Sequence, residues 1–104
     1  MLYRRLTIKF LKRRKKMKLK YNFVTNEVAD KIVAVAVGDD LEKFGGFIKM
    51  NGTGAYIFNM LKNDVTEDEI VAAMLKDYED ATEQEVRETV KEFTDKLKAE
   101  NVIE

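Results

Sequence analysis

Five residue types are absent from this chain of 104 residues, and their absence excludes most catalytic chemistry. The sequence contains no Cys, His, Ser, Trp or Pro. Without Cys or His it lacks the usual ligands of zinc and of iron–sulfur clusters. Without Ser, Cys or His it also lacks the nucleophile and the imidazole base of a catalytic triad. We therefore expect a protein that is not an enzyme and that uses no cofactor or metal ion.

The composition is otherwise that of a small globular domain. Apolar residues make up 45% of the chain, and its length allows one domain with a single core. The absence of Cys is typical of proteins from a reducing compartment, so we expect a cytoplasmic location.

Charge divides the chain into two parts, although its formal net charge is zero. Residues 1–16 hold eight basic residues and no acidic one, which leaves 11 basic and 19 acidic residues, a net charge of −8, in residues 17–104. The basic segment has three interpretations: an amphipathic helix for a membrane or nucleic acid, a targeting segment, or a disordered extension. We favour the extension, because Lys9 interrupts the apolar residues and a patterned domain begins at Met17.

Three short segments predict an antiparallel sheet. In residues 18–24 apolar and polar residues alternate, as in a half-buried strand. Residues 31–37 alternate Val with Ala, which gives one bulky face and one small face. Residues 47–50 form the third strand, and turn residues at 26–30, 38–40 and 45–46 separate the three.

Three helices follow the strands. The first covers residues 53–62, and the next two begin with capping boxes at Thr66–Glu69 and Thr82–Glu85. In the last helix a buried stripe is predicted, and Asn101 is suited to a left-handed C-cap. The stripe consists of Val86, Val90, Phe93 and Leu97. The order predicts an α+β domain, a three-stranded antiparallel sheet followed by three helices.

The sequence with these elements resembles a known family, the PqqD-like proteins, which are RiPP recognition elements. The resemblance covers residues 17–104 and rests on an ordered set of motifs rather than on one piece. The matching residues are Met50 to Ala55, Ile57, Phe58, Leu61, Thr66 to Val71, Tyr78, Val90, Phe93, Leu97, Val102 and Ile103. The sequence departs from the family pattern at Met50, Phe58, Thr89, Thr94 and Asn101, and a polar Thr94 suggests a different peptide preference.

The resemblance implies a winged-helix-like domain without chemistry of its own. Such a domain binds the leader segment of a ribosomally made precursor peptide as an added strand and presents it to a modifying enzyme, commonly a radical S-adenosylmethionine enzyme. The expected edge strand at 47–50 independently supports peptide binding by strand addition, because an extended peptide can satisfy its unpaired N–H and C=O groups. The expected peptide-binding residues are Phe47, Ile48, Lys49 and Met50 of the third strand, and Arg87, Val90, Lys91, Thr94 and Lys98 of the last helix.

Two structural alternatives stay open. The strand at 47–50 could be covered by residues 1–16 or by a second copy of the chain. The basic stripe of Arg87, Lys91 and Lys98, expected to border the peptide groove, could instead be a solvated face with the ion pairs Glu83–Arg87 and Lys91–Asp95.

Two other functions also stay open, a winged-helix protein that binds nucleic acid and a generic interaction subunit. The charge of −8 in residues 17–104 argues against phosphate backbones, so we expect neither nucleic acid nor a membrane as partner.

Overall fold

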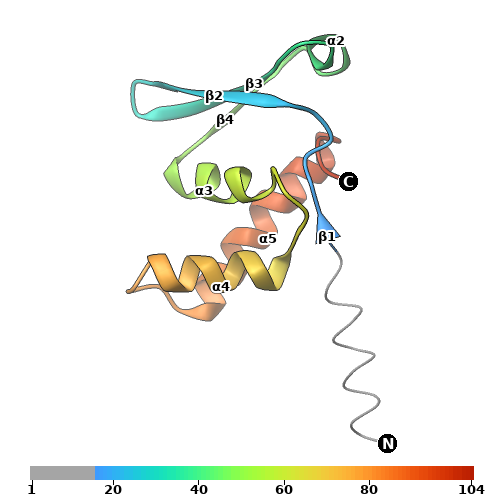
Figure 1. Cartoon of the computed structure of the whole chain (residues 1–104). Coiled ribbons are helices and arrows are strands. Elements are labelled where there is room, and N and C mark those ends of the chain that lie inside the picture. The colour runs from blue at the N-terminus through green and yellow to red at the C-terminus, as the bar shows by residue number, and fades with distance from the viewer. Residues whose placement is uncertain (1–15) are drawn as a thin grey trace, which may run out of the picture.

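The computed structural model describes residues 16–104, in which helices lie against one face of a small antiparallel sheet (Figure 1). The predicted α+β class is confirmed, whereas the expectations for residues 1–15 lie outside the described part. The elements in chain order are β1 (Lys16–Met17), β2 (Phe23–Val28), β3 (Lys31–Ala36), α2 (Asp40–Lys43), β4 (Phe47–Met50), α3 (Gly52–Met60), β5 (Val65–Thr66), α4 (Glu67–Asp77) and α5 (Glu83–Ala99).

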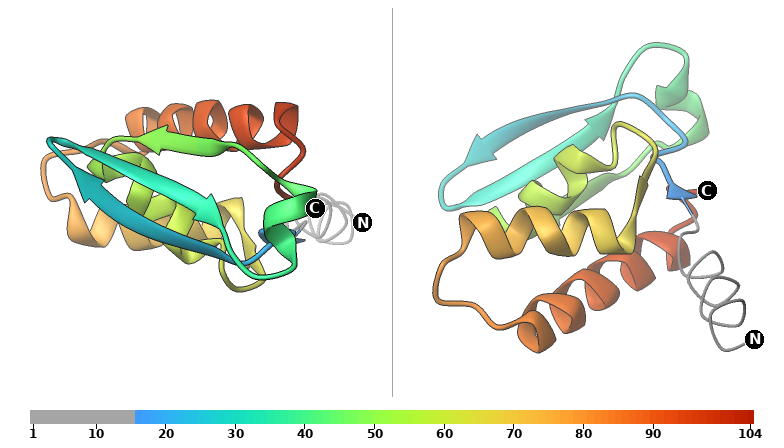
Figure 2. Two further views of the ribbon diagram at one scale, coloured as in Figure 1. Left: turned by 90° about the horizontal axis from the view of Figure 1, so that it is seen from above. Right: turned by 60° about the horizontal axis from the view of Figure 1, so that its bottom comes forward.

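The main sheet has the strand order β2-β3-β4, with all neighbours antiparallel. Its inner face carries the small residues, since Ala34 and Ala36 are fully buried and Ala34 lies opposite Ile48. Small side chains on this face allow α3 to pack closely beneath the sheet, as both views in Figure 2 show. The outer face carries a row of larger residues, Val24, Val35 and Phe47, one from each strand.

The first predicted strand, residues 18–24, is wrong in its position and partner. The strand beside β3 is β2, whereas the chain before it pairs elsewhere. Leu19 forms a bridge with Ile103 and donates its N–H to the carbonyl of Leu61 over 2.9 Å. Ahead of it, β1 pairs with β5 in a separate two-stranded sheet. Alternation indicated an extended, half-buried chain, but it does not identify the segment with which that chain pairs.

The core is centred on Phe58 of α3. The centroids of the Phe58 and Phe23 rings are 5.3 Å apart, in an edge-to-face arrangement. Both predicted capping boxes are present, so α4 and α5 begin where the sequence indicated. At the other end of α5, Asn101 has the predicted left-handed conformation, with φ of 62°. The chain then turns back, and Val102 and Ile103 are buried in the core.

The buried stripe of α5 differs from the predicted one at two positions. Thr94 is buried, with 3% of its surface exposed, whereas Phe93 is only half-buried. The hydroxyl of Thr94 donates to the carbonyl of Lys91 over 3.2 Å, so its polar group is satisfied within the helix. This bond lets a threonine occupy a core position. Thr94, which was expected among the peptide-binding residues of the last helix, is therefore part of the core.

The β2–β3 hairpin turns later than predicted. Residues 26–28 still belong to β2, and only Ala29 and Asp30 form the turn. Ala29 has φ of 59°, in the left-handed region that costs a residue with a Cβ atom about 1–2 kcal/mol. Two-residue hairpin turns with a positive φ at their first position alone, the type II′ turns, normally have Gly there.

Replacing Ala29 by Gly should therefore stabilise the protein by about 0.5–1 kcal/mol, because the relieved strain exceeds the entropy that Gly adds to the unfolded chain. Urea unfolding would measure the change. The same substitution at Ala72, an exposed residue of α4, is the control and should destabilise by about 1 kcal/mol. Equal destabilisation by both substitutions would show that the turn carries no strain.

Candidate functional site at the β4 edge

The candidate site begins where β4 passes directly into α3. The side-chain oxygen of Asn51 accepts the N–H of Gly54 over 2.8 Å and caps the helix. No loop separates the two elements, so the chain turns beneath the sheet instead of returning beside β4. Within residues 16–104, β4 is consequently an edge strand, as the sequence predicted.

The hydrogen-bond register identifies which main-chain groups of β4 are open. The N–H of Val37 donates to the carbonyl of Asn22 over 3.0 Å. The main-chain N–H and C=O groups of Val37, Val35 and Val33 therefore face β2. Main-chain direction reverses at each residue of a strand, so Ala34 and Ile32 face β4 and pair with Ile48 and Met50. The N–H and C=O groups of Phe47 and Lys49 therefore point away from the sheet.

Helix α5 runs beside this open edge (Figure 2, left). The ammonium of Lys96 lies 3.4 Å from the carbonyl oxygen of Lys49, which supports the outward direction of that group. Between the strand and the helix lies a hollow of about 330 Å³, which we call the lysine hollow. Its lining residues are Lys31, Lys49, Met50, Asn51, Phe93 and Lys96.

The base of the lysine hollow is tightly packed around Gly54. A Cβ atom added at Gly54 would lie 2.9 Å from a ring carbon of Phe93 and 3.2 Å from Cβ of Met50. Only glycine therefore lets the Phe93 ring rest against the start of α3. A Cβ atom at Gly52, two residues earlier, would meet no atom within 4 Å.

Gly54→Ala should destabilise the protein by about 1–3 kcal/mol, because the Phe93 ring must move, and this outweighs the better helix propensity of Ala. Gly52→Ala is the matched control in the same turn, and its effect should stay within about 0.5 kcal/mol or be stabilising. Thermal unfolding of both variants would compare them. A Gly54→Ala variant as stable as the control would mean that the Phe93 ring is loosely held.

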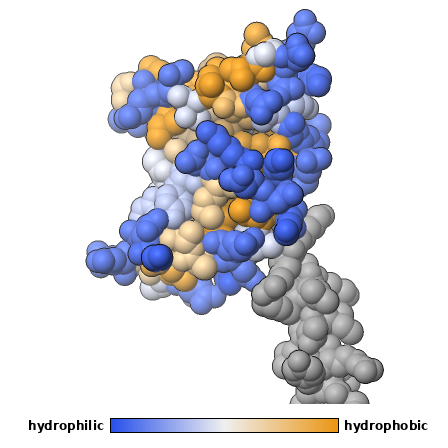
Figure 3. All heavy atoms as spheres, in the orientation of Figure 1, coloured by the Kyte–Doolittle hydropathy of each residue, from blue (hydrophilic) through white to orange (hydrophobic). Residues whose placement is uncertain are grey.

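Of the predicted site residues, the structure brings together those of β4 but not those of α5. Phe47 and Lys49 are exposed, with Phe47 at 58%, whereas Ile48 and Met50 point into the core. Val90 is fully buried and has no exposed surface for a ligand. Phe47 and Val24 are exposed apolar residues on the outer face of the sheet, and apolar surface is visible at the sheet end of the molecule and in smaller patches nearer the helices (Figure 3).

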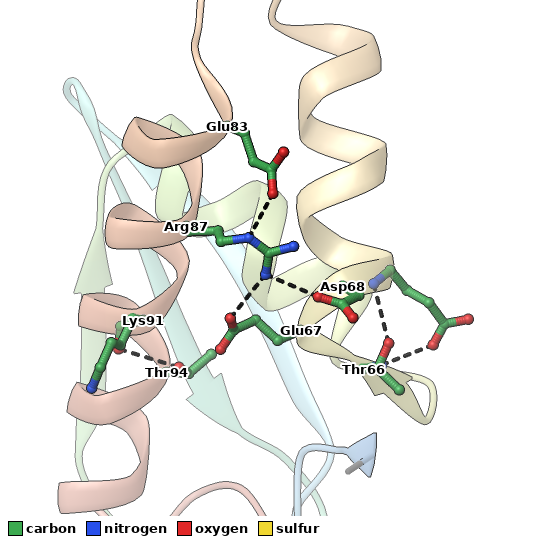
Figure 4. Close-up of polar contacts among 8 residues, drawn as sticks. Thr66, Glu67, Asp68, Glu83, Arg87, Lys91 and Thr94 are labelled. Carbon is green, nitrogen blue, oxygen red and sulfur yellow. Dashed lines mark hydrogen bonds and ion pairs between the residues drawn. The ribbon is translucent and has the colours of Figure 1, made fainter. Parts of the chain in front are cut away.

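Arg87 lies on the side of α5 that faces α4. Its guanidinium contacts Asp68 at 2.9 Å, Glu67 at 3.2 Å and Glu83 at 3.0 Å (Figure 4). Its hydrogen bonds to Glu83 and Asp68 raise the pKa of Arg87 above its usual value. At about 100° per residue, Arg87 and Lys96 lie on opposite sides of α5. Arg87 thus joins two helices and lies away from the β4 edge.

The other residues of the predicted basic stripe lie on the same side of α5 as Arg87. Lys91 pairs with Asp95 at 3.0 Å, and helical spacing places Lys98 on the same side as Arg87. The ion pairs of the solvated-face alternative, Glu83–Arg87 and Lys91–Asp95, are both present. The side of α5 that borders β4 instead carries Phe93 and Lys96, which were not among the predicted contacts, and neither was Lys31.

Arg87→Ala should lower the free energy of unfolding by about 1 kcal/mol at low salt, since three partly exposed ion pairs are lost. The loss should shrink as salt screens the remaining acidic cluster. Lys91→Ala removes one exposed pair and should cost only a few tenths of a kcal/mol. Urea unfolding at two salt concentrations measures both variants. If Arg87→Ala costs no more than Lys91→Ala, the contact between α4 and α5 does not depend on charge.

Two other kinds of site find no support in the described part of the chain. Among residues 16–104, no group of three or more acidic side chains is placed to hold a metal ion. In the same range, no helix combines the length and the apolar character needed to cross a bilayer.

Comparison with known proteins identifies a family and a shared fold. Residues 24–103 match the family described as coenzyme PQQ synthesis protein D (PqqD). The solved structure of TbiB1 in complex with the TbiA(beta) leader peptide is similar, with a TM-score of 0.64 and 20% sequence identity. The alignment covers 84% of this chain and 94% of that one, and at this identity it shows a shared fold. The comparison with curated proteins gave no match.

Proposed function

The chain belongs to the PqqD family, and from this premise we propose that it binds the leader segment of a ribosomally made precursor peptide by strand addition at β4. The observation that carries the proposal is the outward direction of the N–H and C=O groups of Phe47 and Lys49. An extended peptide satisfies these groups with its own main chain. TbiB1, which has the same fold, is described in complex with a leader peptide.

The protein's part in modification is to present the peptide. The residue types needed for a triad or for cluster ligation are missing from the sequence, so the reaction belongs to a partner enzyme. The family resemblance suggests a radical S-adenosylmethionine enzyme as that partner. Binding through the main chain fits this task, because it holds the leader while the remainder of the precursor stays free to reach the enzyme.

The surface of α5 argues against the nucleic-acid alternative. A recognition helix needs cations free to contact phosphates and bases. Here Arg87 and Lys91 are paired with carboxylates, and the exposed residues of the helix include Glu83, Glu88 and Glu92. A peptide at the β4 edge makes no demand on that acidic surface.

Strand addition predicts a specific pattern of amide protection. Display of a random library of 15-residue peptides on the full chain would supply binding probes, which are then synthesised. A saturating probe should slow hydrogen exchange at the amides of Phe47 and Lys49, followed residue by residue by NMR. The amides of Ile48 and Met50 are the internal control, because they already pair with β3 and should change much less. Unchanged exchange at Phe47 and Lys49 would rule out this edge.

The probe itself offers a second test. N-methylation of one peptide amide at a time should weaken binding by about tenfold at every second position, where the amide would donate to β4. Methylation at the intervening amides should leave affinity within about twofold. A uniform loss at all positions, or none, would contradict pairing in a strand.

A further inference from the structure

The lysine hollow contains more positive charge than the protein neutralises. Lys31, Lys49 and Lys96 all line it, and none forms an ion pair with an acidic side chain among residues 16–104. Residues 1–15 contain no Asp or Glu, so they have no acidic side chain to offer either. In a domain rich in acidic residues, this group of cations has no internal counter-ion.

Comparison with two other hollows shows that a lysine-rich lining without a carboxylate is particular to this one. The hollow beside β1 is also lined by three lysines, Lys18, Lys20 and Lys62, but Glu104 lies among them. The hollow between α3 and the α4–α5 connection is lined by four acidic residues and by no lysine or arginine. The lysine hollow alone among these three has cations without a carboxylate, and it alone borders the open edge of β4.

The surroundings of the three lysines strengthen their effect on a bound anion. Phe93 and Met50 form apolar parts of the lining, and an arriving peptide would exclude further water. Charge pairs are stronger where water is excluded. Lys96 now lies against the carbonyl of Lys49, the group that an added strand would engage. A peptide N–H at that carbonyl would compete with Lys96 and leave its ammonium available for an anion.

We propose that the lysine hollow is a carboxylate-binding subsite that selects leader peptides with Asp or Glu directly opposite Lys49. This inference rests on the proposed strand addition. A peptide residue paired with Lys49 through its main chain places its side chain on the same face as Lys49. Opposite charges at directly facing positions stabilise a strand pair. The next residue of the peptide points to the other face, where the half-buried Phe93 favours an apolar side chain.

The test uses the random 15-residue library on the full chain and on two triple variants. Lys31→Gln, Lys49→Gln and Lys96→Gln together neutralise the hollow. Lys62→Gln, Lys76→Gln and Lys98→Gln form the matched control, because they remove the same charge from exposed positions elsewhere. All three proteins keep residues 1–16, so attraction of acidic peptides to that basic segment is equal in each.

The wild type and the control variant should enrich peptides with an acidic residue next to an apolar one, whereas the hollow variant should not. Peptides selected on the wild type should bind the hollow variant at least about tenfold more weakly, and changing their acidic residue to Gln should remove that difference. The difference should shrink at higher salt. Thermal unfolding confirms that both variants are folded.

Two other outcomes distinguish this inference from the proposed function. Selected peptides that protect Phe47 and Lys49 but bind the hollow variant and the control variant equally would overturn the carboxylate subsite and leave strand addition intact. Peptides that protect neither amide would overturn both.

Discussion

The direct passage from β4 into α3 is the constraint on which the rest of this domain depends. Asn51 caps α3 at the point where the strand ends, so the chain leaves the sheet at once and passes beneath it. The helix then buries Ile57 and Phe58 in the core beneath the sheet. Since no later segment among residues 16–104 joins the sheet beside β4, the same short junction that builds the core also leaves the edge open.

An open edge is normally a hazard, because it can pair with any exposed strand. In this domain β4 is short, and α5 runs along its open side. Lys49 places a charge on the edge, and Lys96 reaches one of its free carbonyls. These features disfavour pairing between copies of the chain, since two such edges would bring like charges together. They do not disfavour a peptide that carries the opposite charge, so protection against self-association and selection of a ligand rest on the same side chains.

The elements that the sequence predicted correctly are those set by local chemistry. The strand at 47–50, both capping boxes and the left-handed Asn101 depend on residues within a few positions of one another. The prediction of the first strand was wrong because the alternation around Leu19 and Tyr21 indicates which side chains are buried, but not the segment with which the chain pairs. The partner, the segment around Ile103, is more than eighty residues away in the sequence and could not be inferred from spacing.

The contacts of α5 show the same limit at the candidate site. Helical periodicity gives a buried stripe with two flanks, one containing Arg87 and Lys91 and the other containing Lys96. Both flanks carry basic residues, and nothing local indicates which flank faces β4. The packing of α4 decides it, because the acidic first turn of α4 attracts Arg87. A signal was present in Gly54, whose missing side chain makes room for Phe93, but it requires knowledge of which residues meet.

Net charge proved useful for one class of partner and uninformative for another. A phosphate backbone extends over many charges, so the acidic character of residues 17–104 weighs against it as a whole. A leader peptide contacts a few residues at one edge, and at physiological ionic strength charges more than about 8 Å away from it are largely screened. Within that distance the lysines of the hollow count for more than the acidic residues on the far side of α5. An acidic domain can therefore select an acidic peptide, provided that a group of unpaired cations lies beside the strand on which that peptide is held.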